Sequence, residues 1–319
     1  MPYLIGVDEA GYGPRLGPLV ICATVWQVPN DPRDTDLYSA LYDGISNAAD
    51  RNDDRVAVAD SKALYRNRRG LDVLERGVLA AAAQLRPVPD SWRALWGQLA
   101  ADATCELAEL PWYREYDAEA PVAVDAESLT AAIDIWRRAS ASADVRLVGL
   151  QARVLFPRAF NEGVARHGSK GAVLTEATLQ LVREMLEPLP SQPTAVVCDK
   201  HGGRNRYAAP VQEAFSDRLL DVLGEGAEES RYRCALGERA IEVRFCVRAE
   251  RHLQVALASM TAKYLRELAM MAFNAYWCRQ VPELRPTAGY PVDSLRFKSQ
   301  IAELQSTLGI DDHVLWRGR

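Results

Sequence analysis

The stretch 3–20, YLIGVDEAGYGPRLGPLV, constrains the fold most strongly, because an apolar run, two adjacent carboxylates and a glycine-rich turn follow one another in it. Residues 3–7 favour β-structure and are too few for a helix, so they predict a buried strand that ends at Asp8 and Glu9. Because α/β sheets form their sites at the carboxyl ends of strands, these acids are candidate site residues. They could also be solvated residues of a hairpin turn that leads into a second strand over 19–26.

Three glycines, Gly11, Gly13 and Gly17, interrupt regular structure after the two acids. A turn of this kind can bring its backbone close to a ligand, because glycine has no side chain in the way. We therefore expect the turn to form part of any site built on the acids. It lacks the Gly-Lys-Ser/Thr ending of a P-loop, which argues against a nucleotide-phosphate binder.

The composition indicates a globular protein whose partners must be recognised locally. The 319 residues are 48% hydrophobic and 25% charged, which suits one large domain or a domain with an inserted subdomain. The net charge of −5 gives no general attraction to nucleic acid. Such a partner would need a local basic surface or metal ions to hold it.

The cysteine pattern and the lack of targeting signals predict a cytoplasmic location. The six cysteines are scattered, with no CxxC pair and no histidine at ligand spacing, so we expect neither a zinc site nor a disulfide scaffold. We find no basic region followed by an apolar segment at the N-terminus, and no run of membrane-spanning length. We therefore expect no membrane partner.

A second candidate loop follows the short apolar segment 57–59 and carries Asp60, Ser61 and Lys62. A basic cluster comes directly after it, at Arg66, Arg68 and Arg69. Basic loops beside carboxylates are suited to hold phosphates. Asp60 or Ser61 could equally be the N-cap of a helix that continues over 71–79.

Residues 87–144 have the character of an insertion. Trp92 and Trp96 recur at helical spacing, and a second amphipathic helix is expected around Trp136. Aromatic residues at this spacing are typical of a core, so we expect a helical subdomain that packs on the main body and can be deleted without loss of the main fold. The rest of the chain divides into a main domain, 1–86 with 145–300, and a C-terminal tail, 301–319.

A second apolar run, 194–198, repeats the pattern of the first, because it also ends on a carboxylate, Asp199. Two acids that end neighbouring parallel strands would meet at one edge of a sheet. The basic loop that follows offers Lys200, Arg204 and Arg206 as phosphate contacts. A lone acid after a strand can also be a simple turn former.

The region after this loop predicts a hairpin and a long helix. Residues 231–236 and 240–247 read as two strands joined by a turn at Gly237. A helix is expected to open at Glu250 and to run through Met271. Acids favour helix N-termini in any case, but Glu250 is also a further candidate for the site.

Taken together, these motifs resemble the type 2 ribonuclease H family, which comprises ribonucleases HII and HIII. The family's first motif, Asp-Glu-x-Gly-x-Gly and then Gly-Pro-Leu, is matched by residues 8–13 and 17–19. Its later motifs are matched in order by Asp60-Ser61-Lys62, by Asp199, and by Glu250 ahead of the Ala-Ser-x-x-Ala-Lys segment 258–263. Dispersed motifs in the right order are a specific signal, and the segment 87–144 lies outside them.

Some residues resemble one branch of the family and some the other. Tyr290, in Gly-Tyr-Pro, is similar to the ribonuclease HII tyrosine that packs beside a ribonucleotide, which favours cutting at a single embedded ribonucleotide. Glu250, where ribonuclease HII usually has Asp, and the segment around Asn161 are closer to HIII, which favours runs of ribonucleotides. Tyr12 stands where the family commonly has a basic residue or threonine.

The resemblance implies an RNase H-like α/β fold: a mixed, mainly parallel five-stranded sheet flanked by helices, with a helical insertion and a C-terminal helical tail. It implies an endonuclease that hydrolyses the RNA strand of RNA–DNA hybrids and leaves 3′-hydroxyl and 5′-phosphate ends. The implied catalytic residues and ligands of Mg²⁺ or Mn²⁺ are Asp8, Glu9, Asp199 and Glu250. The alternative is a protein of the same fold that binds such hybrids without cleaving them.

The chemistry of these residue types agrees with that implication. Four carboxylates in one site repel one another, and hard divalent cations relieve the repulsion. Two such ions can activate a water and stabilise the leaving oxygen. Backbone groups at glycines could reach the ribose 2′-hydroxyl, which distinguishes RNA from DNA. The expected substrate contacts are Gly11, Tyr12, Gly13, Ser61, Lys62, Lys200, Arg204, Arg206 and Tyr290.

Overall fold

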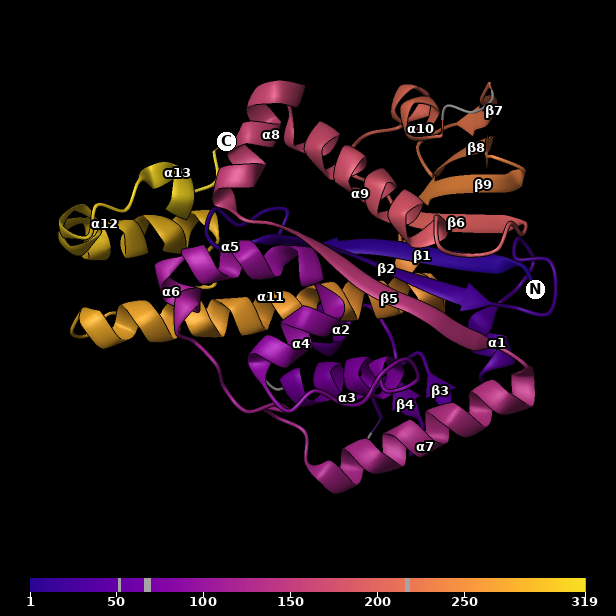
Figure 1. The fold of residues 1–319 in the computed structure, drawn as a ribbon, viewed down its shortest axis with the longest axis horizontal. Helices are drawn as coiled ribbons and strands as arrows, with labels where there is room; N and C mark the ends of the chain where they lie inside the picture. The colour runs from indigo at the N-terminus through magenta and orange to yellow at the C-terminus, as the bar shows by residue number, and fades with distance from the viewer. Residues whose placement is uncertain (51–52, 66–69, 216–218, 319) are drawn as a thin grey trace.

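The computed structural model describes residues 1–50, 53–65, 70–215 and 219–318. They form a mixed α/β protein in which helices flank a seven-stranded sheet (Figure 1). The strands are β1 Tyr3–Ala10, β2 Leu19–Gln27, β3 Ile45–Ser46, β4 Val56–Ala57, β5 Arg146–Leu155, β6 Thr194–Asp199, β7 Asp221–Glu225, β8 Glu229–Leu236 and β9 Arg239–Cys246. The small pair β3–β4 is a separate sheet.

The helices of the described residues fall into three stretches of the chain: between β2 and β5, between β5 and β7, and after β9. The first stretch holds α1 Leu37–Ala40, α2 Ser61–Leu64, α3 Leu71–Ala82, α4 Trp92–Leu99, α5 Thr104–Glu109, α6 Pro111–Arg114 and α7 Ala126–Ala143. The second holds α8 Pro157–His167, α9 Lys170–Leu186 and α10 Ala208–Ala214, and the third α11 Leu253–Gln280, α12 Pro291–Thr307 and α13 Asp312–Leu315. Two short 3₁₀ turns are η2 Ala101–Ala103 and η3 Ala249–Arg251.

The order of strands in the large sheet is β5-β2-β1-β6-β9-β8-β7. Strand β1 pairs in parallel with β6, and β6 pairs in parallel with β9, so the carboxyl ends of these three strands lie at one edge. Asp8 and Glu9 near the end of β1 and Asp199 at the end of β6 are therefore neighbours, and the residues that follow β9 arrive at the same edge. The sheet topology thus brings distant motifs together.

The expected mixed sheet flanked by helices is confirmed, but the expected number of five strands and the mainly parallel direction are wrong. The sheet has seven strands, and β1–β2, β2–β5, β8–β9 and β7–β8 are antiparallel. The predicted hairpin is confirmed as β8 and β9. The additional edge strand β7 is exposed at every residue. Its sequence, Asp-Val-Leu-Gly-Glu, does not alternate apolar and polar residues, so the pattern did not predict a strand there.

Two hydrophobic cores lie on opposite faces of the sheet. On β1, Leu4 belongs to the core under α11, whereas Ile5 and Val7 belong to the core under α9. Figure 1 shows α11 along one face and α9 along the other. Burial of both faces explains why the sequence of β1 is nearly all apolar until its acids.

The start of α11 is packed directly on the central strands. A Cβ atom at Gly6 of β1 would lie 2.2 Å from the carbonyl carbon of Gln254, so only glycine fits there. The Thr24 hydroxyl of β2 donates a hydrogen bond of 2.8 Å to the Gln254 carbonyl oxygen. These contacts place Glu250, just ahead of the helix, against the end of β1.

The segment 87–144 packs into the main core. Trp136 of α7 stacks on Trp26 of β2, with ring centroids 6.2 Å apart. Trp112 of α6 is buried against Phe273 of α11, which leaves its ring no surface for stacking on a nucleic acid base. The expected packing of these aromatic residues on the main body is therefore observed, while the domain boundaries themselves stay a prediction.

The C-terminal region is helical, but its first helix, α12, begins at Pro291, ahead of the expected tail. The last helix, α13, packs beside α8, and the C-terminal end lies next to α8 (Figure 1). All six cysteines are free. Within the described ranges we find no helix whose length and apolar character would allow it to cross a bilayer.

Candidate active site

The candidate acids come from three elements that end at the same edge of the sheet. Asp8 and Glu9 lie within β1, which continues to Ala10 and does not end at the acids as expected. Asp199 is the last residue of β6. Glu250 lies in the 3₁₀ turn η3, so it precedes the long helix instead of opening it.

Asp8 is the most buried of these acids, with 6% of its surface exposed. Burial raises its pKa well above the usual value, and repulsion from Glu9, Glu250 and Asp199 raises it further. A hydrogen bond from the Ser259 hydroxyl opposes part of this increase. The other three acids therefore lie within electrostatic reach of Asp8.

Glu9 and the two later acids show the same behaviour. Burial, followed by repulsion from Asp199, raises the pKa of Glu9 to about 7, although Lys62 acts against the increase. Burial is also the largest cause of the raised pKa of Asp199 and of Glu250. The Ala249 N–H donates a hydrogen bond of 3.0 Å to Asp199 Oδ1, which ties the start of η3 to the end of β6.

Two serines connect the first motif to the second and the fourth. The Ser61 and Ser259 hydroxyls are 3.0 Å apart and hydrogen-bonded, and both side chains are buried. Since Ser259 also bonds to Asp8, the pair links α2, α11 and β1. Ser61 was expected to contact substrate, whereas its hydroxyl is used inside the protein. Ser259 was not among the expected site residues, and the Ala-Ser-x-x-Ala-Lys segment was the signal that could have identified it.

Lys62 is the basic residue nearest to the acids. Burial lowers its pKa, but attraction to Asp8, Glu250 and two further carboxylates outweighs burial and leaves the pKa raised. Asp60 accepts a hydrogen bond of 2.8 Å from the Lys62 N–H and caps α2, as the N-cap interpretation expects. The basic cluster Arg66, Arg68 and Arg69 lies outside the described residues.

The glycine-rich turn lies beside the acids and is closely packed at Gly11 but exposed at Gly13. Gly11 has a φ of +94°, and a Cβ atom there would lie 2.5 Å from the Pro18 carbonyl oxygen. Gly13 is exposed, and a Cβ atom there would meet nothing within 4 Å. Burial and the Glu9 carboxylate raise the pKa of the Tyr12 phenol, so this side chain stands near the acid site.

The basic loop after Asp199 is only partly available to a ligand. Lys200 is 7% exposed, donates a hydrogen bond of 2.7 Å to Asn205 Oδ1 and also bonds to the Gly226 carbonyl oxygen. Its ammonium thus joins this loop to the β7–β8 turn, and we assign it no substrate contact. The sequence did not indicate that Lys200 is buried, because the residue lies among other basic residues of the loop.

The two arginines of the same loop differ from each other. Arg204 donates hydrogen bonds to the Arg206 carbonyl oxygen and to the Thr175 hydroxyl, at 2.8 and 3.1 Å. Two of its three guanidinium nitrogens are therefore bonded within the protein. Arg206 is exposed. Arg206 is therefore the better candidate of the two for a phosphate contact.

Tyr290 lies at the far side of the glycine-rich turn and is 52% exposed. The preceding Gly289 has a φ of +81° and accepts hydrogen bonds from the N–H groups of Arg15 and Leu16, at 2.7 and 3.3 Å. A Cβ atom at Gly289 would lie 2.6 Å from the Leu16 carbonyl oxygen. The C-terminal Gly-Tyr motif is thereby joined to the first motif.

The donor set fits a hard divalent cation, because it consists of carboxylates whose mutual repulsion a cation would relieve. Among the described residues, however, no three His, Cys, Asp or Glu side chains are already gathered closely enough to hold an ion. The carboxylates are close enough to repel one another. To ligate a metal, their side chains would have to turn toward a common point.

We expect the replacement Glu9→Gln to stabilise the metal-free protein, and to do so most at high pH. Because the folded-state pKa of Glu9 is about 7, above the unfolded value of 4.5, its penalty on folding is complete above pH 7 and disappears as the pH falls toward 4.5. The difference in unfolding free energy should be on the order of 3 kcal/mol near pH 8.

Urea unfolding in EDTA from pH 5 to pH 8.5 measures this difference. Comparing the variant with the wild type cancels the opposite effect of His201, whose pKa burial lowers to about 3 in both proteins. A difference that stays constant over the whole range would contradict the raised pKa.

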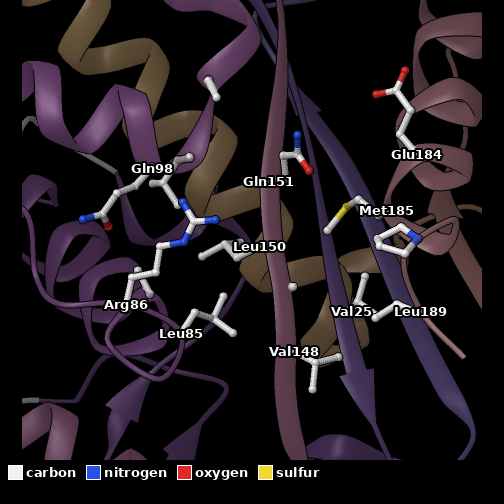
Figure 2. Close-up of a pocket in the computed structure, with 15 residues that line it drawn as sticks. Val25, Leu85, Arg86, Gln98, Val148, Leu150, Gln151, Glu184, Met185 and Leu189 are labelled. Atoms are coloured by element: carbon white, nitrogen blue, oxygen red, sulfur yellow. The ribbon is translucent and has the colours of Figure 1, made fainter.

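A cavity of about 400 Å³ lies elsewhere, across the edge strand β5. Figure 2 shows its lining side chains on both sides of that strand, among them Leu85, Leu150 and Met185. None of the candidate acids lines it. The acid site is therefore separate from this cavity.

The solved structures to which the chain is similar include ribonucleases H of type 2. The ribonuclease H2 of Pyrococcus horikoshii OT3 is 17% identical, with a TM-score of 0.43 over 98% of this chain and 92% of the other. Ribonuclease HII of Archaeoglobus fulgidus, in a complex with PCNA, is 15% identical, with a TM-score of 0.46 over 99% and 94%. RNase H3 of Aquifex aeolicus is 16% identical, with a TM-score of 0.42 over 98% and 71%.

These structures bear the names of the family that the sequence motifs resemble. Because the identities and the TM-scores are low, we rest no inference on the similarity. No protein-family model and no curated protein matches the sequence. The function must be argued from the residues of the site.

Proposed function

We propose that this protein is a metal-dependent endonuclease that hydrolyses the RNA strand of RNA–DNA hybrids and leaves 3′-hydroxyl and 5′-phosphate ends. The observation that carries the proposal is the cluster of Asp8, Glu9, Asp199 and Glu250. The four carboxyls come from three distant segments to one edge of the sheet, and repulsion within the cluster raises the pKa of Asp8, Glu9 and Glu250. Buried like charges of this kind destabilise a fold, so their gathering points to a function.

The four acids would hold Mg²⁺ or Mn²⁺. Bound divalent cations supply Lewis-acid activation of water and stabilisation of the leaving oxygen of a phosphodiester. Asp8 would be oriented for ligation by the Ser259 hydroxyl, and Asp199 by the Ala249 N–H. Lys62 balances part of the negative charge until a cation arrives.

The glycine-rich turn would bind the RNA strand. The backbone groups of the half-buried Gly11 and the exposed Gly13 would exchange hydrogen bonds with a ribose 2′-hydroxyl, which DNA lacks. Tyr12 and Tyr290 flank this turn and are exposed enough to contact a sugar. Lys62 and Arg206 would contact phosphates on either side of the acids.

The proposal is tested by cleavage of a labelled RNA–DNA hybrid with Mg²⁺, Mn²⁺ or EDTA. We expect cleavage with either metal, none in EDTA, and products that a phosphatase can dephosphorylate at the 5′ end. Thermal melting without substrate gives an independent measurement, because a bound ion should raise Tm. Tight binding of the hybrid without cleavage under every metal condition would instead support the non-cleaving alternative.

We expect long hybrids to be cut well and a single ribonucleotide embedded in duplex DNA to be cut poorly. Glu250 and the Asn161 region favour runs of ribonucleotides, while Tyr290 favours single ones, and we give the tyrosine less weight because Gly-Tyr-Pro also forms a turn and begins α12. Initial rates on the two duplexes measure the preference.

The variant Tyr290→Ala separates the two contributions, and Tyr42→Ala, at an exposed tyrosine that lines none of the proposed site, is the matched control. We expect Tyr290→Ala to change the rate on long hybrids by less than about 10-fold. Efficient cutting at a lone ribonucleotide that disappears in this variant would overturn the expected preference.

A further inference from the structure

A cluster of positive charges lies apart from the acids, where the C-terminal segment meets the glycine-rich turn. Arg317 is 2% exposed, and none of its three guanidinium nitrogens has a hydrogen-bond partner in the described part of the chain. Its Cζ atom lies 5.1 Å from the centre of the Phe160 ring. A buried guanidinium whose N–H donors are all unused is rare, because charge and donors both lose their solvation.

The charged neighbours that affect Arg317 are also cationic. Lys170, the first residue of α9, has its Nζ atom 5.8 Å from the centre of the same Phe160 ring. Burial lowers the pKa of Lys170, and repulsion from Arg317 and Arg15 lowers it further. Burial likewise lowers the pKa of Arg317 to about 9, and Arg266 adds to the decrease. Every charge that shifts these two groups is positive.

The backbone around Arg317 is held from both sides, so the charge has a fixed position. The Arg317 N–H donates a hydrogen bond of 2.9 Å to the Arg15 carbonyl oxygen. The Asn161 side chain donates to the Trp316 carbonyl oxygen and accepts from the Gly318 N–H, both at 2.7 Å. Figure 1 shows this end of the chain beside α8. An unpaired cation is thus positioned by specific contacts.

We propose that Arg15, Lys170 and Arg317 form a binding site for a phosphate group. Arginine and lysine donors on several elements suit a compact anion with several oxygens. The 17-residue helix α9 begins at Lys170, and its N-terminal dipole favours negative charge at the same place. A bound phosphate would pair the guanidinium that the protein itself leaves unpaired.

The site adjoins the proposed nuclease site. A Cβ atom at Gly171 would lie 3.7 Å from the Tyr12 hydroxyl, so the start of α9 lies against the turn that follows Asp8 and Glu9. The phosphate could belong to the backbone of a bound nucleic acid or to a free phosphate compound. A nucleic acid backbone as the source rests on the proposed function, whereas a free phosphate compound does not.

Inorganic phosphate tests the site without substrate. We expect phosphate to raise the Tm of the wild-type protein in a concentration-dependent manner and to have little effect on Arg317→Gln. Without phosphate, Arg317→Gln should melt at a temperature equal to or higher than the wild type, because the variant lacks the unpaired buried charge. Arg279→Gln removes a positive charge at an exposed position of α11 and should respond to phosphate as the wild type does.

Binding of an RNA–DNA hybrid in EDTA tests the nucleic-acid source. If a backbone phosphate occupies the site, Arg317→Gln should bind several-fold more weakly, and the slope of log affinity against log salt should decrease in magnitude by about 1. Lys170→Gln, on a different element, is the second variant should Arg317→Gln fold poorly. Stabilisation by phosphate with unchanged hybrid binding would assign the site to a free phosphate compound.

The proposal is overturned if phosphate stabilises wild type and Arg317→Gln equally and both bind the hybrid with the same affinity and salt dependence. A lower Tm of Arg317→Gln in phosphate-free buffer, restored by Arg317→Lys but insensitive to phosphate, would show that the side chain only packs on Phe160. Neither result depends on cleavage. Failure of the phosphate site is therefore distinguishable from failure of the proposed nuclease activity.

Discussion

Replacing Asp8 by Asn is expected to abolish cleavage of RNA–DNA hybrids while the metal-free protein becomes more stable. The replacement keeps the shape of the side chain but removes one charge from a cluster in which burial and three other acids raise the pKa of this carboxyl. Loss of a metal ligand removes several kcal/mol of transition-state stabilisation, which corresponds to a decrease in rate of about 1000-fold or more.

Asp199→Asn should give the same loss, since its carboxylate faces the same site. The matched control is Glu303→Gln, which removes a charge from an exposed position of α12 and should leave rate and stability unchanged. Initial rates with Mg²⁺ and with Mn²⁺, together with melting curves in EDTA, measure both effects. Near-normal turnover of Asp199→Asn would show that the site assignment is wrong.

Deletion of residues 87–144 is expected to unfold the protein, although the sequence alone predicts a removable subdomain. The buried Glu75 carboxylate accepts hydrogen bonds of 2.8, 2.6 and 2.7 Å from the N–H groups of Val122, Ala123 and Val124. Without this segment, the Tyr264 hydroxyl, at 2.6 Å, would be the hydrogen-bond partner left to this carboxylate among the described residues. Breaking such a set of bonds to a buried charge costs about 3–5 kcal/mol.

The aromatic contacts add to this loss. Loss of Trp136 would expose Trp26, and loss of Trp112 would expose Phe273. Removing one large buried aromatic side chain costs about 3–5 kcal/mol. The total stability of a typical protein is about 5–15 kcal/mol. Circular dichroism and thermal melting of a variant with a short linker measure the outcome.

Glu75→Ala is the smaller companion variant, and we expect it to lower Tm without unfolding the protein at 25 °C. A deletion variant that melts cooperatively and still cleaves hybrids would show that 87–144 is an independent unit after all. In that case the predicted domain boundaries would be supported.

The parts of the fold that could be predicted from the sequence are those in which local pattern and burial agree. The apolar runs of β1 and β6 are strands because both of their faces are covered, and their acids mark the edge of the sheet. The hairpin β8–β9 has its turn residue at Gly237, whose φ is +59°. Helix α9 begins after Ser169, whose side chain accepts a hydrogen bond from the Ala172 N–H.

The remaining features depend on contacts between residues far apart in the chain. The local sequence does not distinguish the buried Lys200 from the exposed Arg206. The difference arises because the Lys200 ammonium donates hydrogen bonds to Asn205 Oδ1 and to the Gly226 carbonyl oxygen. The pairing of Ser61 with Ser259 joins residues separated by 198 positions. Arg317 is buried by contacts with the Phe160 ring and the Arg15 backbone, which lie far from it in the sequence.

The strand order has a consequence for the timing of folding. Strands β1 and β2 are neighbours in sequence and can pair early, but β6 and β9 reach β1 only after long stretches of chain have been made. Closing such long loops slows folding more than it weakens the final structure. A nascent chain on the ribosome therefore carries Asp8 and Glu9 for most of its synthesis without Asp199 or Glu250 beside them. The acid cluster is assembled late, when Glu250 and the helix that holds it have emerged.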